Sequence, residues 1–292
     1  DAQRMLKELA TNYSWTKAGE RAQRILLGSD DLFVKTEGDS LYAKVAQMQK
    51  WKMLETANFI IYYQNNNYAK EVAKAIEDVF KKVVVELGIK DVTWKYRKCK
   101  IFLFDEDDKW TEFKKSADRV TEWASAFAVP EFREIYGNAS DGKRLLNKTM
   151  PYEITHLIWG EYLGKNAYAP LWLTEGLAVH QEFIKKNSNY QLVKENIDSG
   201  KGYAVEKLTQ IVRFPEKDED IHHFYAASMA FVEFILEEYD YDSFHRMITG
   251  LRGTGTSVIP YEKICGRYLK EKPADVERKF IEFVDRKASD SE

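Results

Sequence analysis

The feature that most constrains the fold is a change in hydrophobic pattern near residue 143. Before it, two β-branched and aromatic runs, Phe59–Tyr63 and Cys99–Phe104, predict strands, and the stretch 68–87 between them has the apolar spacing of a helix. After it, the pattern is nearly all helical, with turn signals between the segments. The sequence therefore predicts an α+β protein: a small mixed sheet followed by a mostly helical C-terminal part.

Weaker patterns complete the predicted organisation. A short helix is expected near Trp110–Lys115, an interrupted strand over Ala126–Tyr136, and a turn at Gly137-Asn138. The charged and amphipathic N-terminal region indicates a helical lead-in. We expect a lead-in over 1–56 and a main domain over 57–292, divided into an α/β subdomain (57–142) and a helical subdomain (143–292). A ligand site is expected between the two subdomains.

Composition excludes some classes of function. The 44 Lys and Arg residues are balanced by 47 Asp and Glu, so the chain has no basic excess with which to bind nucleic acid. The most apolar stretch, Phe224–Leu236, is too short for a membrane span and carries Glu233. The two cysteines, Cys99 and Cys265, lie among apolar neighbours, and buried free thiols are expected, although one bridge between them stays open.

The N-terminal sequence does not determine the cellular compartment of the protein. The sequence begins at Asp1, without an initiator Met or a basic-then-apolar leader. Removal of a leader, with an extracytoplasmic or secreted location, is one interpretation of this start. The sequence predicts no oligomeric state.

Two short segments carry the residues typical of a catalytic or metal site. The first reads Pro151-Tyr152-Glu153-Ile154-Thr155-His156, and on a helix Tyr152 and His156 are one turn apart, with Glu153 flanking the same face. The second, Leu171–Ala178, follows Pro170, which suits the start of a helix, and it carries Glu175. An imidazole and two carboxylates in this pattern predict metal or acid–base chemistry.

This pattern resembles that of a known family. His-Glu-x-x-His, eighteen intervening residues and then Glu in a Trp-Leu-x-Glu-Gly-x-Ala context marks the gluzincin zinc metallopeptidases. Eighteen residues separate His156 from Glu175 here, and Trp172, Leu173, Gly176 and Ala178 surround the glutamate as in that context. The chain looks most like the bacterial peptidase MA-like proteins, and the resemblance extends more weakly from Phe59 to about Val284.

The resemblance implies a mechanism, residue by residue. His156 and Glu175 match the second and third zinc ligands, and Glu153 matches the glutamate that accepts a proton from the metal-bound water. Tyr225 matches a tyrosine that hydrogen-bonds the oxyanion. The implied cofactor is zinc, and the implied substrate is a peptide or protein whose backbone pairs with a sheet edge near Ala126–Ile135.

The first ligand of the family pattern is changed, because Tyr152 stands where the first histidine is expected. A phenol with a pKa of about 10 binds metal poorly until the metal deprotonates it. Three outcomes are open: Tyr152 ligates zinc as a phenolate, another group replaces it, or the metal site is lost. His222, three residues before Tyr225 on the same expected helix, is a candidate replacement.

Three functions follow. The first is a zinc-dependent peptidase with an atypical metal site, and the second is an inactive pseudopeptidase that serves as a peptide-binding or scaffold protein. The third is a purely structural helical protein without a cleft at Glu153 and Glu175. Some of these residues also have a purely structural interpretation. Tyr225 would then be a core aromatic, Glu175 a solvated residue in a first helical turn, and His222 and His223 a solvated pair.

Overall fold

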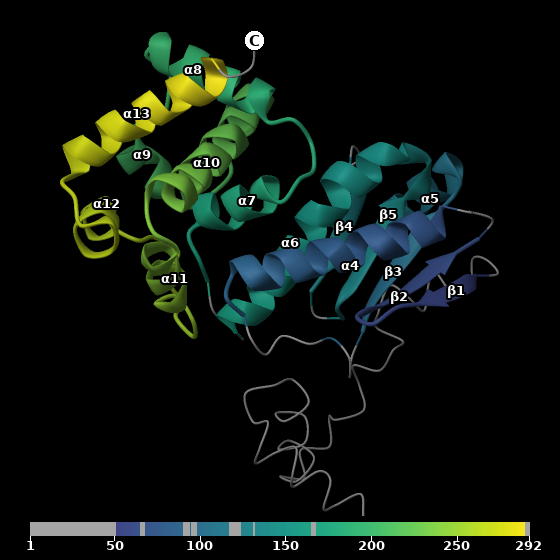
Figure 1. Ribbon diagram of the computed structural model, residues 1–292. Coiled ribbons are helices and arrows are strands. Elements are labelled where there is room, and N and C mark those ends of the chain that lie inside the picture. The colour runs from purple at the N-terminus through teal and green to yellow at the C-terminus, as the bar shows by residue number, and fades with distance from the viewer. Residues whose placement is uncertain are drawn as a thin grey trace, which may run out of the picture.

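The computed structural model describes residues 51–64, 68–89, 94, 98–116, 124–130, 132–164 and 168–289 (Figure 1). The helical lead-in expected over 1–56 lies outside these residues except at its end. That end contains a strand, β1 (Lys52–Glu55), and not a helix. β1 pairs antiparallel with β2 (Phe59–Tyr63), and this backbone pairing with a neighbouring strand holds the four residues extended.

Five strands form one mixed sheet in the order β1-β2-β3-β5-β4. The three central strands run parallel, and an antiparallel strand flanks them on each side. The strand predicted at Cys99–Phe104 is β3, with the same bounds, and the interrupted strand is β4 (Ala126–Val129) and β5 (Glu134–Asn138). The mixed α+β class is therefore confirmed, and β4 forms one edge of the sheet among the described strands.

The turn predicted at Gly137-Asn138 is wrong, because β5 runs through both residues. Gly137 pairs with Leu103 on one side and Ala126 on the other. A Cβ on Gly137 would lie 3.0 Å from the Met150 side chain, so the glycine allows close packing here. The chain turns one residue later, in the 3-10 helix η3 (Ala139–Asp141).

Helices cover both faces of the sheet. One face packs against α4 (Ala69–Glu86), whose apolar stripe matches the helix predicted over 68–87. On the other face, the rings of Tyr62, Phe102 and Tyr136 stack across three strands with centroids 4.8 Å apart. Helix α5 (Asp107–Ser116) covers these rings with its own aromatic residues. The alternation of side chains along each strand therefore supplies two separate cores.

The C-terminal part of the described chain is mostly helical, as predicted. A π-helix, η4 (Leu145–Thr149), leads into the first of its long helices. The elements that follow are α6 (Met150–Leu163), α7 (Leu171–His180), α8 (Asn187–Asp198), α9 (Val205–Thr209), α10 (Asp218–Glu238), α11 (Tyr241–Thr249), α12 (Tyr261–Lys263), the π-helix η5 (Ile264–Leu269) and α13 (Pro273–Ser289). α10 lies at the centre of these helices, packed against α7 and α8 (Figure 1).

The two predicted subdomains share one apolar core. The buried cluster on the α4 side of the sheet continues through α6 and α7 into α10 and α13 without a break. Cys99 and Cys265 are both buried and free within it, as expected. No helix in the described part of the chain combines the length and the apolar character that a membrane span requires.

Candidate functional site

Helix α6 places the first motif beside the edge of the sheet. The π-helix η4 runs directly into it, and Pro151 lies in the first turn of α6. The rings of Tyr152 and His156 meet edge to face, with centroids 4.5 Å apart. The predicted one-turn spacing of these two side chains is confirmed.

Helix α7 carries Glu175 into the interior. Its side chain is buried, with 6% of the residue exposed, so a solvated first-turn role is wrong. The Trp159 indole N–H of α6 donates to the Thr174 hydroxyl at 3.1 Å and ties the two motif helices together next to Glu175. The apolar residues of the Trp-Leu-x-Glu-Gly context therefore serve to bury this turn of α7.

Gly176 allows α7 to lie directly against α10. A Cβ at this position would lie 2.4 Å from the carbonyl oxygen of Ser228 and 2.7 Å from a methyl group of Val232. No side chain larger than hydrogen fits such a contact. The glycine next to Glu175 thus sets the distance between the helix that carries Glu175 and the helix that carries Tyr225.

Tyr152, His156 and Glu175 converge on one point. The Tyr152 hydroxyl donates a short hydrogen bond to Oε2 of Glu175. His156 Nε2 lies 3.6 Å from the same oxygen. Burial and the nearby charge of Glu175 raise the pKa of the Tyr152 phenol well above its usual value. Tyr152 is therefore a neutral hydrogen-bond donor to a carboxylate.

Glu153 lies at the boundary between α6 and the edge strand β4. Burial, followed by the charge of Glu175, raises the pKa of the Glu153 carboxyl to about 8, and a hydrogen bond with the Ala128 backbone acts in the opposite direction. A buried carboxyl group whose pKa is raised in this way, next to a second carboxylate, is typical of acid–base sites. The glutamate predicted as a general base thus lies near the other predicted site residues.

Tyr225 reaches the same cluster from α10. Its ring centroid lies 6.4 Å from that of Tyr152. Burial, followed by the charge of Glu175, raises the pKa of the Tyr225 phenol to about 12. The residue is partly buried and also packs on the main core, so the two roles predicted for it are compatible.

The remaining histidines lie apart from this cluster. His222 is exposed, and no hydrogen bond or ion pair joins it to the cluster within the described residues. The predicted solvated pair is wrong for His223, which is buried and stacks on Tyr203 with ring centroids 4.6 Å apart. The apolar face of α10 includes position 223, and this helical periodicity was the signal for its burial.

His180, at the C-terminal end of α7, lies in a separate ionic cluster. Its Nε2 lies 2.6 Å from Glu86 on α4, and its Nδ1 lies 2.7 Å from Glu233 on α10. Lys186 and the Tyr190 hydroxyl also contact Glu233. This buried network links α4 to the helical part of the molecule, and nothing in the local sequence pattern predicts it.

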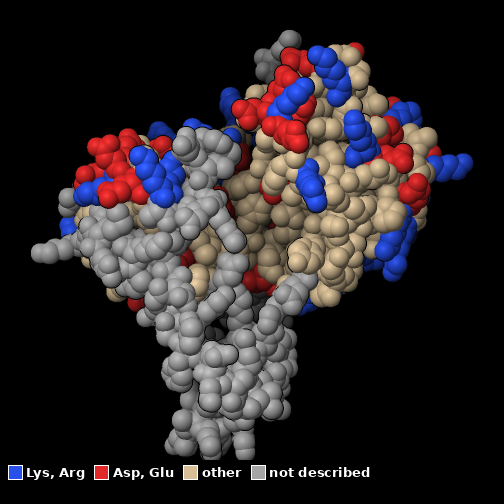
Figure 2. All heavy atoms as spheres, turned by 180° about the vertical axis from the view of Figure 1, so that it is seen from behind, with Lys and Arg blue, Asp and Glu red and all other residues tan. Residues whose placement is uncertain are grey.

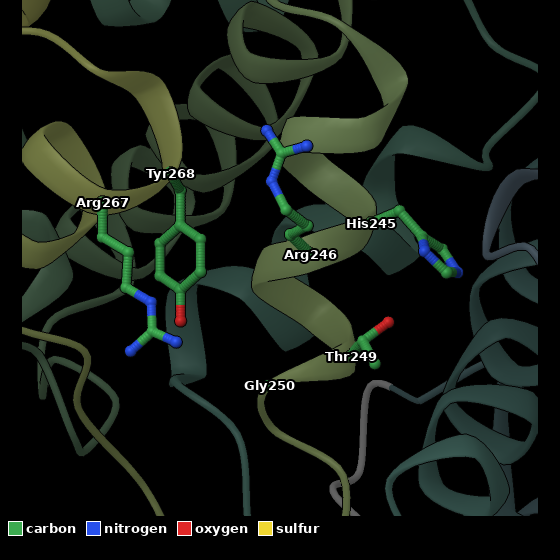
Figure 3. Close-up of a pocket in the computed structure, with 6 residues that line it drawn as sticks. All are labelled: His245, Arg246, Thr249, Gly250, Arg267 and Tyr268. Carbon is green, nitrogen blue, oxygen red and sulfur yellow. The ribbon is translucent and has the colours of Figure 1, made fainter.

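The space-filling view shows a hollow between the sheet part and the helical part, with acidic side chains visible inside it (Figure 2). A different concavity, of about 390 Å³, lies at α11 and η5. His245 there points away from Arg267 and Tyr268, so these side chains do not converge on a ligand position (Figure 3). The cluster of Tyr152, Glu153, His156, Glu175 and Tyr225 is therefore the stronger candidate site.

The donor atoms fit a zinc ion only in part. Two ligand atoms that each lie about 2.1 Å from a tetrahedral zinc ion are about 3.4 Å from each other. The distance between His156 Nε2 and Glu175 Oε2 is close to this, at 3.6 Å. The Tyr152 hydroxyl is hydrogen-bonded to Glu175 Oε2, which is too close for two ligands of one ion. In the described part of the chain, no three His, Cys, Asp or Glu side chains are grouped so as to hold a metal. The arrangement supplies two ligands and a neutral phenol.

Comparisons with known proteins add no family assignment: no protein-family model matches the chain, and no curated protein shows significant similarity to it.

Proposed function

We propose that this chain is a gluzincin-like protein of the peptidase MA-like kind that holds an extended peptide in its cleft without hydrolysing it. The observation that carries this proposal is the hydrogen bond from the Tyr152 hydroxyl to Glu175. A neutral donor occupies the place of the first metal ligand and pairs with the carboxylate that a metal would need.

The edge strand β4 supports a peptide as the ligand. In the described part of the sheet, β4 pairs only with β5, and no other described strand pairs with its second edge. Glu153 interacts with the backbone of Ala128 in this strand. A peptide that pairs with β4 would therefore pass beside the candidate site, with main-chain hydrogen bonds supplying much of the affinity.

A zinc-dependent peptidase is the second candidate, favoured by the spacing of His156 Nε2 and Glu175 Oε2. It requires Tyr152 to leave Glu175 or to lose its proton. His156 and Glu175 would then hold zinc, Glu153 would accept a proton from the attacking water, and Tyr225 would stabilise the oxyanion. The raised pKa of Tyr152 makes the loss of its proton costly.

The test compares the wild type with Tyr152→His. Both are incubated with zinc and a mixture of labelled random decapeptides, and both binding and cleavage are measured. We expect the wild type to bind peptides without cleaving them, and the variant to gain zinc and cleavage that Glu153→Gln removes. Zinc-dependent cleavage by the wild type, abolished by Glu153→Gln, would establish the second candidate instead.

A further inference from the structure

Two large apolar side chains are exposed on the segment between α9 and α10. Phe214 has 46% of its surface exposed and Val212 has 52%. The Phe214 ring lies 5.8 Å from that of Tyr225 and 6.0 Å from that of Phe224. Phe224 is fully buried, so Phe214 rests on the core on one side and faces solvent on the other.

Of these two residues, Phe214 contacts the candidate site through Tyr225. Tyr225 contacts Phe214 through its ring, and its centroid also lies 6.4 Å from that of Tyr152. Tyr152 in turn donates its hydroxyl hydrogen to Glu175. A row of three aromatic rings therefore runs from the buried carboxylate to the exposed Phe214.

We propose that Phe214 and Val212 form an apolar subsite that selects a large apolar side chain, preferably an aromatic one, from the bound peptide. This inference rests on the proposed function, because it assumes that a peptide occupies the cleft. Covering the exposed faces of both residues removes apolar surface from water, and an aromatic partner can add ring contact with Phe214. The subsite lies on α10's side of the cleft, so side-chain selection would be separate from main-chain pairing with β4.

The experiment uses fluorescence anisotropy with two labelled decapeptides that are identical except for Phe or Ala at one central position. We expect the wild type to bind the Phe peptide about tenfold more tightly than the Ala peptide, the scale set by burying one ring. Phe214→Ala should bind both peptides with nearly the same affinity. Phe214→Leu, which keeps most of the apolar volume, should retain most of the discrimination and so excludes misfolding as the cause.

A matched control is available in Phe183, which is 45% exposed in the segment after α7 and contacts Lys82. Phe183→Ala should leave the discrimination unchanged. Equal binding of both peptides by the wild type, or unchanged discrimination in Phe214→Ala, would overturn the subsite alone. Failure of the wild type to bind any decapeptide, in the mixture or in this pair, would overturn both the proposed function and the subsite.

Discussion

The Tyr152 hydroxyl donates a hydrogen bond to Oε2 of Glu175, across the contact between α6 and α7. The carboxylate is buried, and His156 Nε2 lies 3.6 Å from the same oxygen. A buried carboxylate requires a donor or a cation, because its loss of hydration is otherwise uncompensated. Here a neutral phenol meets that requirement, in the place where the family pattern has a metal ligand.

Removal of this donor should destabilise the protein. Tyr152→Phe leaves one Glu175 oxygen without its donor, and we expect a loss of about 1.5–3 kcal/mol in the free energy of unfolding. Denaturant titration monitored by circular dichroism measures it. Tyr225→Phe is the control, with a smaller expected loss, because Tyr225 is not the donor to Glu175. Equal stability of the wild type and Tyr152→Phe would show that the hydrogen bond is not formed in solution.

The contact between α7 and α10 should tolerate no side chain at Gly176. Gly176→Ala places a methyl group 2.4 Å from the Ser228 carbonyl oxygen, and overpacking of this kind costs about 1–3 kcal/mol or more. The matched control is Gly160→Ala on α6, where nothing lies within 4 Å of the added Cβ. That change should stabilise by about 0.5–1 kcal/mol. Similar melting temperatures for the two variants would contradict the packing.

The ionic cluster around His180 should make stability depend on pH. Burial opposes its charge, but hydrogen bonds with Glu233 and Glu86 raise the pKa of His180 above its usual value. Burial also opposes the charge of Glu233, but the hydrogen bond with His180 and the charge of Lys186 lower its pKa to about 2. We expect His180→Gln to cost about 3 kcal/mol near pH 6, because it leaves buried carboxylates short of a partner.

The sign of each shift defines the pH window of this effect. The contribution of His180 is complete below its unfolded pKa, about 6.5, and disappears as the pH rises through its raised folded value. The contribution of Glu233 is complete above its unfolded pKa and disappears as the pH falls toward 2. Denaturation from pH 3 to 9 should therefore show the largest difference between wild type and His180→Gln between about pH 4.5 and 6.5. Arg278→Gln, which removes an exposed ion pair with Glu282, should show little change at any pH.

Much of the fold follows from local patterns. β-branched and aromatic runs predicted β2 and β3 with the observed bounds, because a buried central strand requires those residues. Two failures have a common cause: β1 and the end of β5 are extended because neighbouring strands pair with them. Local sequence at Lys52–Glu55 and Gly137-Asn138 carries no signal of those partners.

The candidate site was also partly predictable from the sequence. Helical spacing predicted that Tyr152 and His156 share a face, and the family resemblance predicted that Glu175 joins them. The hydrogen bond that Tyr152 donates, the ring contact between Phe214 and Tyr225 and the network around His180 depend on contacts between distant segments. Side-chain contacts of this kind arise from tertiary packing, which the sequence pattern of one segment does not specify.

The most direct test of the central claim is the zinc content of the purified wild type and of Tyr152→His, measured by elemental analysis after dialysis against micromolar zinc and then metal-free buffer. If the phenol takes the place of a ligand, the wild type should retain well under about half an equivalent of zinc per chain, and Tyr152→His should retain about one equivalent. One equivalent of zinc retained by the wild type, with Tyr152 in its first coordination shell, would contradict the account.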